Sequence, residues 1–104
     1  MDLDFYQTEA MSYRIDSANE AYALFNLAAE VGEVLGLVAK LIRDGAGEKN
    51  MEELMKKELG DVMWMVCAVA DDAGLSLSEI CTENLAKLAD RKARNKIMGS
   101  GDER

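Results

Sequence analysis

Hydrophobic residues recur at helical spacing along almost the whole chain, which predicts a protein built from helices alone. Short polar or glycine-containing stretches interrupt this spacing and separate the periodic segments. The chain contains no proline, which agrees with helices as the dominant element. We expect four helices, over residues 3–13, 17–44, 50–73 and 76–96.

The expected helix ends rest on short capping patterns. Ser17, Asn50 and Ser76 each stand three residues before a glutamate, the spacing of a capping box at a helix start. Gly45 and Gly47 follow the second periodic segment and are expected to end that helix, because glycine readily adopts the left-handed conformation found there.

The expected fold class is all-α and four-helix bundle-like. The second and third helices would each be roughly 35–40 Å long at about 1.5 Å per residue. A short loop joins them, so we expect them to pack antiparallel, with the two shorter helices beside them. Residues 62–70 are apolar on every side of the third helix, which a small chain can hardly cover alone. We therefore expect a homodimer or a dimer of dimers, with the third helix in the interface.

Length and charge narrow the class of protein. The 104 residues correspond to a single domain, over residues 1–104. The net charge of −8 argues against binding to nucleic acid or to an anionic membrane. The start of the chain has no basic region typical of a signal peptide, and we expect a cytoplasmic protein. Histidine is absent, which excludes Ser-His-Asp chemistry and the usual zinc ligand.

Two pairs of carboxylates are the informative feature of the chain. Glu30 and Glu33 belong to the second predicted helix, Glu58 and Asp61 to the third, and each pair is spaced i, i+3. Glu30 and Glu58 fall within the apolar arcs of their helices. A buried carboxylate is unfavourable unless it is paired or binds a cation. Four carboxylates between adjacent helices would also repel one another.

Several interpretations of these carboxylates stay open. Each pair could be a solvated surface motif, although two inward-facing pairs on adjacent helices make this less favoured. Lys56 and Lys57 point away from Glu58 on the helix and do not suit it as partners. A carboxylate-bridged di-iron bundle normally requires Glu-x-x-His, which this chain lacks. All-oxygen donors without histidine predict a site for Mg²⁺, with Mn²⁺ as a substitute.

The fourth predicted helix carries a stripe of hydrogen-bond donors. Asn84, Lys87 and Arg91 lie on one side of it, along the border of its apolar face. They could hold phosphate oxygens. The two cations could equally be placed there to complement the dipole at the end of the helix. Residues 98–104 show no periodicity and are expected to form a flexible tail.

In their order along the chain, these stretches resemble the MazG-like nucleoside triphosphate pyrophosphohydrolases of the all-α NTP pyrophosphohydrolase superfamily. The resemblance extends over most of the chain. It rests on the sequences LAAEVGEV at 27–34, ELGDVMW at 58–64, LSLSEI at 75–80, NLAKLADRK at 84–92 and GSGD at 99–102.

The resemblance implies Mg²⁺-dependent hydrolysis of an NTP or dNTP to the monophosphate and pyrophosphate, in housecleaning of the nucleotide pool, by dimers or tetramers. It also implies a role for each matching residue. The implied metal ligands are Glu30, Glu33, Glu58 and Asp61; the implied substrate contacts are Asn84, Lys87 and Arg91; and candidate base-pocket residues are Gln7, Asn26 and Trp64. We assign the general base to Glu33, at the rim of the carboxylates. The tail at 98–104 becomes a candidate for closing over a phosphate chain.

Two groups of alternatives remain at this stage. Within the superfamily, the chain could be a phosphoribosyl-ATP pyrophosphohydrolase-like enzyme or a dNTPase specific for one nucleotide. Outside it, a non-enzymatic helical interaction protein could use the carboxylates to hold a structural cation. The sequence does not select a base or a sugar, and it does not separate a dimer from a tetramer.

Overall fold

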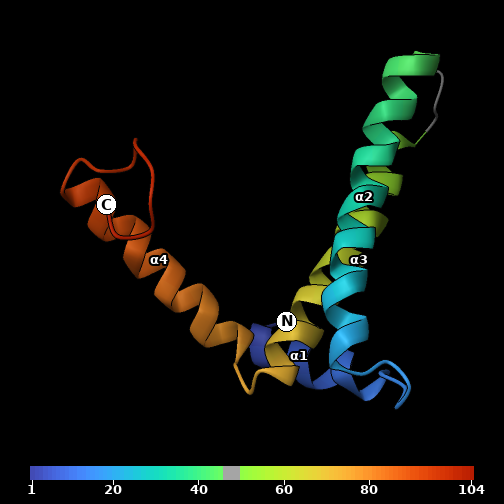
Figure 1. The fold of residues 1–104 in the computed structure, drawn as a ribbon, viewed down its shortest axis with the longest axis horizontal. Coiled ribbons are helices and arrows are strands. Elements are labelled where there is room, and N and C mark those ends of the chain that lie inside the picture. Colours follow the sequence, from blue (N-terminus) through green and yellow to red (C-terminus); the bar gives the residue numbers. More distant parts are fainter. Residues whose placement is uncertain (46–49) are drawn as a thin grey trace.

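The computed structural model describes residues 1–45 and 50–104, and every regular element in these ranges is an α-helix (Figure 1). This confirms the expected all-α class. Gly47, expected to help end the second helix, lies outside the described residues. Within the described ranges, no helix combines the length and the apolar character needed to cross a bilayer. The helices are α1 (Leu3–Ser12), α2 (Glu20–Asp44), α3 (Met51–Asp72) and α4 (Leu77–Ala93).

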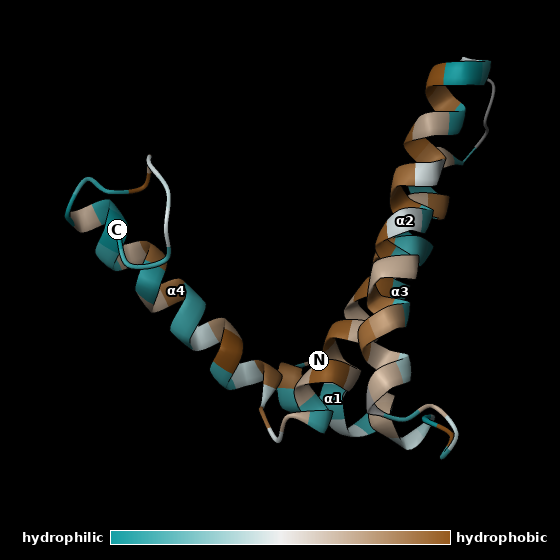
Figure 2. Ribbon diagram, in the orientation of Figure 1, coloured by the Kyte–Doolittle hydropathy of each residue, from teal (hydrophilic) through white to brown (hydrophobic). Residues whose placement is uncertain are grey.

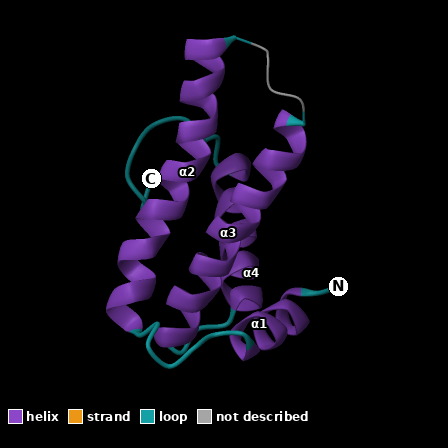
Figure 3. Ribbon diagram, turned by 90° about the vertical axis from the view of Figure 1, so that its right-hand side faces the viewer, coloured by secondary structure: helices purple, strands orange, loops and turns teal. Residues whose placement is uncertain are grey.

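The two long helices α2 and α3 run antiparallel and side by side, as expected, and α1 packs near one end of the pair (Figures 1 and 3). Ala23 of α2 and Ala68 of α3 are both fully buried between them. Side chains this small allow the two helix axes to approach closely, which brings the polar residues farther along both helices within reach of one another.

The apolar segment 62–70 of α3 is covered largely by α1 and α2 of the same chain. Met65, Cys67, Ala68 and Ala70 are at most 4% exposed. The buried residues form two core clusters, one of Ala10, Cys67, Ala70 and Leu77 and one of Ala23, Met65 and Ala68. Trp64 packs against both core clusters, and its indole N–H donates to the carbonyl of Ala10 at 3.1 Å. Much of this segment is therefore covered within one chain by α1 and α2, although Met63 stays 44% exposed. An interface of α3 with a second chain stays a prediction.

Exposed apolar side chains also lie along α2 and α4, and Figure 2 shows the hydrophobic stretches of α2 in brown. They include Leu24 at 60%, Phe25 at 79%, Leu35 at 64%, Ile42 at 80% and Leu85 at 67% exposed.

The fourth helix packs on α1 and diverges from the α2–α3 pair (Figure 1). Its start is capped as expected, since the Ser76 hydroxyl accepts from the Glu79 amide at 3.3 Å. Gln7 of α1 fixes the turn before it. The Gln7 side chain donates to the Leu75 carbonyl at 2.9 Å and accepts from the Leu77 amide at 2.8 Å. One amide group thus sets where α4 leaves the body of the molecule.

The start of α2 differs from the sequence-based expectation. Its N-cap is Asn19, whose side chain accepts from the Tyr22 amide at 3.3 Å, and Ser17 lies in the preceding turn. The cause is Arg14, whose side chain is held by Asp72 of α3. The Arg14 guanidinium donates to the Ala18 carbonyl at 2.7 Å and so holds this turn outside the helix.

The start of α3 also differs. Asn50 adopts a left-handed conformation with φ of 68° and makes no capping bond with its side chain. Glu53, expected as its reciprocal partner, instead pairs with Lys56 at 3.2 Å. The helix begins where expected but without the capping box.

Candidate metal centre

Three of the predicted carboxylates converge between the two long helices. Glu30 of α2 and Glu58 and Asp61 of α3 can each present one oxygen, and these oxygens all lie within 4.8 Å of one another. Glu30 and Glu58 are half-buried, whereas Asp61 is exposed. The i, i+3 spacing of Glu58 and Asp61 places both on the side of α3 that meets Glu30.

The electrostatics of this cluster are unfavourable without a cation. Burial raises the pKa of Glu58 above its ordinary value, and the charges of Glu33, Asp61 and Glu30 raise it further. The positive charge of Lys40 lowers the pKa of Glu58, but this is the smallest of the contributions. Among the described residues, no ion pair involves any of the four carboxylates. The described residues therefore supply no ion pair that would offset the mutual repulsion of these carboxylates.

Glu33 lies at the edge of the cluster. Its side chain is exposed, and it is not one of the three residues whose oxygens converge. Its charge nevertheless acts on Glu58, which places it nearby. The structure therefore brings together three of the four expected ligands and leaves the fourth beside them, accessible to water.

Asn26 is placed one helical turn before Glu30, next to the cluster. Its side-chain amide donates to Glu30 Oε1 at 3.3 Å and to the sulfur of Met65 at 3.0 Å. It thus helps to orient one of the clustered carboxylates. Met65, missed in the sequence analysis, supports Asn26 from α3.

A hollow of about 400 Å³ lies beside Trp64, one helical turn from Asp61. The two tyrosines that line it were not predicted from the sequence. One signal for Tyr22 was present, because it is spaced by four from Asn26 and by eight from Glu30, along one side of α2. The hollow is lined by Tyr13, Ile15, Ser17, Ala18, Tyr22 and Trp64.

Gln7 does not line this hollow. Both ends of its amide are used in the bonds to Leu75 and Leu77 described above. In this structure the residue positions α4.

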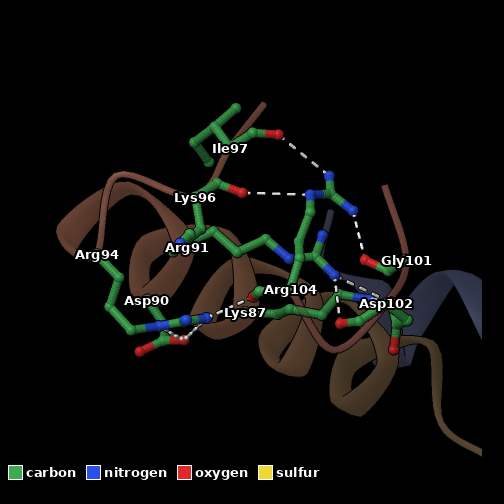
Figure 4. Close-up of polar contacts among 9 residues, drawn as sticks. All are labelled: Lys87, Asp90, Arg91, Arg94, Lys96, Ile97, Gly101, Asp102 and Arg104. Atoms are coloured by element: carbon green, nitrogen blue, oxygen red, sulfur yellow. Dashed lines mark hydrogen bonds and ion pairs between the residues drawn. The ribbon is translucent and has the colours of Figure 1, made fainter. Parts of the chain in front are cut away.

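The donors of α4 lie apart from the carboxylates within one chain, because α4 diverges from the α2–α3 pair (Figure 1). Lys87 and Arg91 instead contact Asp102 of the C-terminal tail, at 2.7 and 3.2 Å (Figure 4). Asn84 is exposed and lines a second hollow, of about 500 Å³, together with Lys87 and Asp102. The three donors share one side of α4, as predicted from the sequence, whereas Asp102 was not predicted as the partner of Lys87 and Arg91.

The donor set of the cluster fits a hard divalent cation. Carboxylate oxygens are the ligands that Mg²⁺ and Mn²⁺ prefer, and the chain has no histidine to favour a softer metal. With ligands from α2 and α3 alone, one side of such an ion would stay open to water or to phosphate oxygens.

The comparisons with known proteins agree with this arrangement. The family profile described as MazG nucleotide pyrophosphohydrolase domain matches residues 19–95, which include all four carboxylates. The Gene 37 protein of Mycobacterium phage L5 is 38% identical over an alignment of 115 positions, which covers 100% of both chains. The crystal structure of iMazG from Vibrio DAT 722 aligns with a TM-score of 0.60 and 28% identity, covering 89% of this chain and 97% of that chain.

Proposed function

Because the chain belongs to the MazG nucleotide pyrophosphohydrolase family, we propose that it hydrolyses a nucleoside triphosphate, ribo- or deoxyribo-, to the monophosphate and pyrophosphate. The observation that carries this proposal is the cluster of Glu30, Glu58 and Asp61, whose oxygens lie within 4.8 Å of one another without a cationic partner among the described residues. Such an enzyme serves to clear nucleotides from the cellular pool.

Glu30, Glu58 and Asp61 would hold Mg²⁺, with Glu33 as a further ligand at the rim. When bound, the ion supplies Lewis acidity: it neutralises phosphate charge and favours ionisation of water. Asn26 keeps Glu30 oriented toward the site through its 3.3 Å hydrogen bond. Water attacks the α-phosphorus, the bond to the bridging oxygen breaks, and pyrophosphate leaves. Glu33, exposed beside the cluster, accepts the proton of the attacking water.

The hollow beside Trp64 is the proposed site for the base. It is about 400 Å³ in volume and presents Tyr13, Tyr22 and Trp64, side chains on which a flat ring can stack. Tyr22 precedes Glu30 by two helical turns, a separation of about 12 Å, which a nucleotide with its phosphates at the carboxylates can span. Asn26, between them on α2, is placed to contact the sugar or the base edge.

A homodimer, alone or paired as a tetramer, is the proposed assembly. Exposed apolar residues on α2 and α4, such as Phe25 at 79% and Leu85 at 67%, need a partner to be covered. The α4 donors and the carboxylates lie apart within one chain. A second copy can supply its Asn84, Lys87 and Arg91 to the carboxylates of the first.

The function is tested by a screen for pyrophosphate release over all NTPs and dNTPs with Mg²⁺, with phosphoribosyl-ATP included. Release from several nucleotides supports a housecleaning role, whereas one dominant substrate identifies a specific dNTPase or a phosphoribosyl-ATP pyrophosphohydrolase-like enzyme. If no substrate releases pyrophosphate with either Mg²⁺ or Mn²⁺, the non-enzymatic interaction protein is favoured instead.

The assembly is tested by mixing two variants of reduced activity, Asp61→Asn and Lys87→Ala, under conditions that allow subunits to exchange. If each site combines the carboxylates of one chain with α4 of the other, a mixed dimer contains one intact site and activity returns. If each site lies within one chain, mixing restores nothing. Sedimentation of the unmixed protein at micromolar concentration provides the oligomeric state.

A further inference from the structure

The C-terminal tail folds back on α4 and places a carboxylate against the side chains of Lys87 and Arg91 (Figure 4). Asp102 Oδ1 lies 2.7 Å from Lys87 Nζ and 3.2 Å from Arg91 Nη2. Arg91 Nη2 also donates to the Asp102 carbonyl at 2.6 Å. The hydrogen bond from Lys87 is the main reason that the pKa of Asp102 lies below its ordinary value. Lys87 and Arg91, one turn apart on α4, would repel each other without this counter-ion.

The tail reaches this position through two glycines and an arginine. Gly99 and Gly101 have φ of 114° and 88°, a conformation that other residues rarely adopt. Arg94 donates to the Arg104 carbonyl at 2.7 Å. The Arg104 guanidinium in turn donates to the carbonyls of Lys96, Ile97 and Gly101. The tail is thus fastened to the end of α4 independently of Asp102.

This contact occupies the donors that the proposed function assigns to phosphate. Arg91 is only 6% exposed beneath the tail, and its Nε is buried without a hydrogen-bond partner among the described residues. The neighbouring hollow of about 500 Å³ is lined by Asn84, Lys87 and Asp102. A phosphate entering it meets two donors and one repelling carboxylate, and it cannot reach Arg91 until Asp102 moves.

We propose that Asp102 is an internal counter-ion, which holds Lys87 and Arg91 in the free chain and is displaced by the triphosphate of the substrate. This inference rests on the proposed function, since that function places the phosphates at α4. A tethered carboxylate competes at a high effective concentration, on the order of millimolar for a short linker. It therefore excludes weakly bound single phosphates, whereas a triphosphate of about −4 charge engages both cations and displaces it.

The chain offers a matched control for the test. Glu103, next to Asp102, is exposed and makes no ion pair with any residue that the structure describes. Asp102→Asn and Glu103→Gln change the net charge equally, so a difference between them reports the contact with Lys87 and Arg91. The probe is inorganic tripolyphosphate with Mg²⁺, measured by isothermal titration calorimetry on the full chain.

Asp102→Asn is expected to bind tripolyphosphate about 3- to 30-fold more tightly than Glu103→Gln, because two partly exposed ion pairs no longer compete. Equal or weaker binding overturns the proposal. As a second measurement, deuterium uptake over residues 97–104 is expected to rise when tripolyphosphate binds. A fall in uptake means that the tail closes over the phosphates, and it also overturns displacement.

Lys87→Ala separates failure of this inference from failure of the proposed function. If it loses affinity for tripolyphosphate while Asp102→Asn gains none, the counter-ion role is wrong and the phosphate site on α4 stands. If Lys87→Ala binds tripolyphosphate as tightly as the parent chain, the phosphate site on α4 is wrong, and the inference falls with it. Pyrophosphate release by the parent chain is read separately and decides the hydrolase activity.

Discussion

The α2–α3 pair and α4 each bring like charges together, but among the described residues only the charges on α4 have an opposite charge beside them. Between α2 and α3, Glu30, Glu58 and Asp61 converge without a cation from the described part of the chain. On α4, Lys87 and Arg91 share the carboxylate of Asp102 at 2.7 and 3.2 Å. The proposed function supplies the first region with an ion from solution, whereas the second is neutralised by the chain itself. Loss of a charge should therefore affect catalysis and stability differently in the two regions.

The largest effect is expected in the uncompensated region. Asp61→Asn removes one charged ligand from a cluster that the chain cannot complete in any other way, so we expect kcat to fall more than about 100-fold. Mg²⁺ affinity should fall with it. Steady-state kinetics and Mg²⁺ titration measure both. Glu52→Gln, an exposed acid in the first turn of α3, is the matched control and should behave as the parent chain.

On α4, Lys87→Ala should weaken the interaction with substrate and leave the binding of Mg²⁺ unchanged. It removes one charge-assisted phosphate contact, so kcat/KM should fall roughly 10- to 150-fold, equivalent to about 1.5–3 kcal/mol. Mg²⁺ affinity of the free protein should be unchanged. If Lys87→Ala lowered Mg²⁺ affinity as strongly as Asp61→Asn, the division between the two regions would be wrong.

The two regions should also differ in their thermal response to Mg²⁺. An ion that binds only the folded state adds about 2.7 kcal/mol at 100 times its Kd, which raises the Tm by several degrees. Glu58→Gln should stabilise the metal-free protein by removing repulsion and should abolish the response to Mg²⁺. Asp102→Asn should retain that response. Melting curves with and without millimolar Mg²⁺ measure all three proteins.

The smallest effect concerns a second internally neutralised pair. Arg14 binds Asp72 through two hydrogen bonds of 2.6 and 2.8 Å, and this hydrogen bonding is the main cause that lowers the pKa of Asp72 below its ordinary value. A carboxylate whose pKa is lower in the folded than in the unfolded state stabilises the fold at pH values above its unfolded-state pKa. This stabilisation is lost as the pH falls through its folded-state pKa. Asp72→Asn should therefore lower the Tm at pH 7 and weaken its dependence on pH below about 4. A Tm-versus-pH profile below 4 that matches the parent's would contradict this.

Much of this organisation could be predicted from local sequence. The helical spacing predicted four helices, and the i, i+3 carboxylates predicted a cluster between the long ones. These features depend on neighbours a few residues apart, which a single sequence shows directly. The family comparison then covers the same region, residues 19–95.

The remaining features depend on contacts between distant residues. Ser17 and Asn19 both suit an N-cap, and Arg14, held by the distant Asp72, decides between them through its bond to Ala18. No pattern indicated that α1 would cover residues 62–70, or that Gln7 would direct α4 away from the carboxylates. Asp102 meets Lys87 only because Gly99 and Gly101 let the tail reverse.

The position of Trp64 has an optical consequence. It is the only tryptophan in the chain, and it packs against both core clusters one turn from Asp61. Its indole N–H is held by the Ala10 carbonyl at 3.1 Å. The tryptophan fluorescence of the protein therefore arises from one fixed chromophore where α1, α2 and α3 meet. Its emission wavelength reports unfolding of this junction, and its intensity reports a ring that stacks in the adjacent hollow, without any attached label.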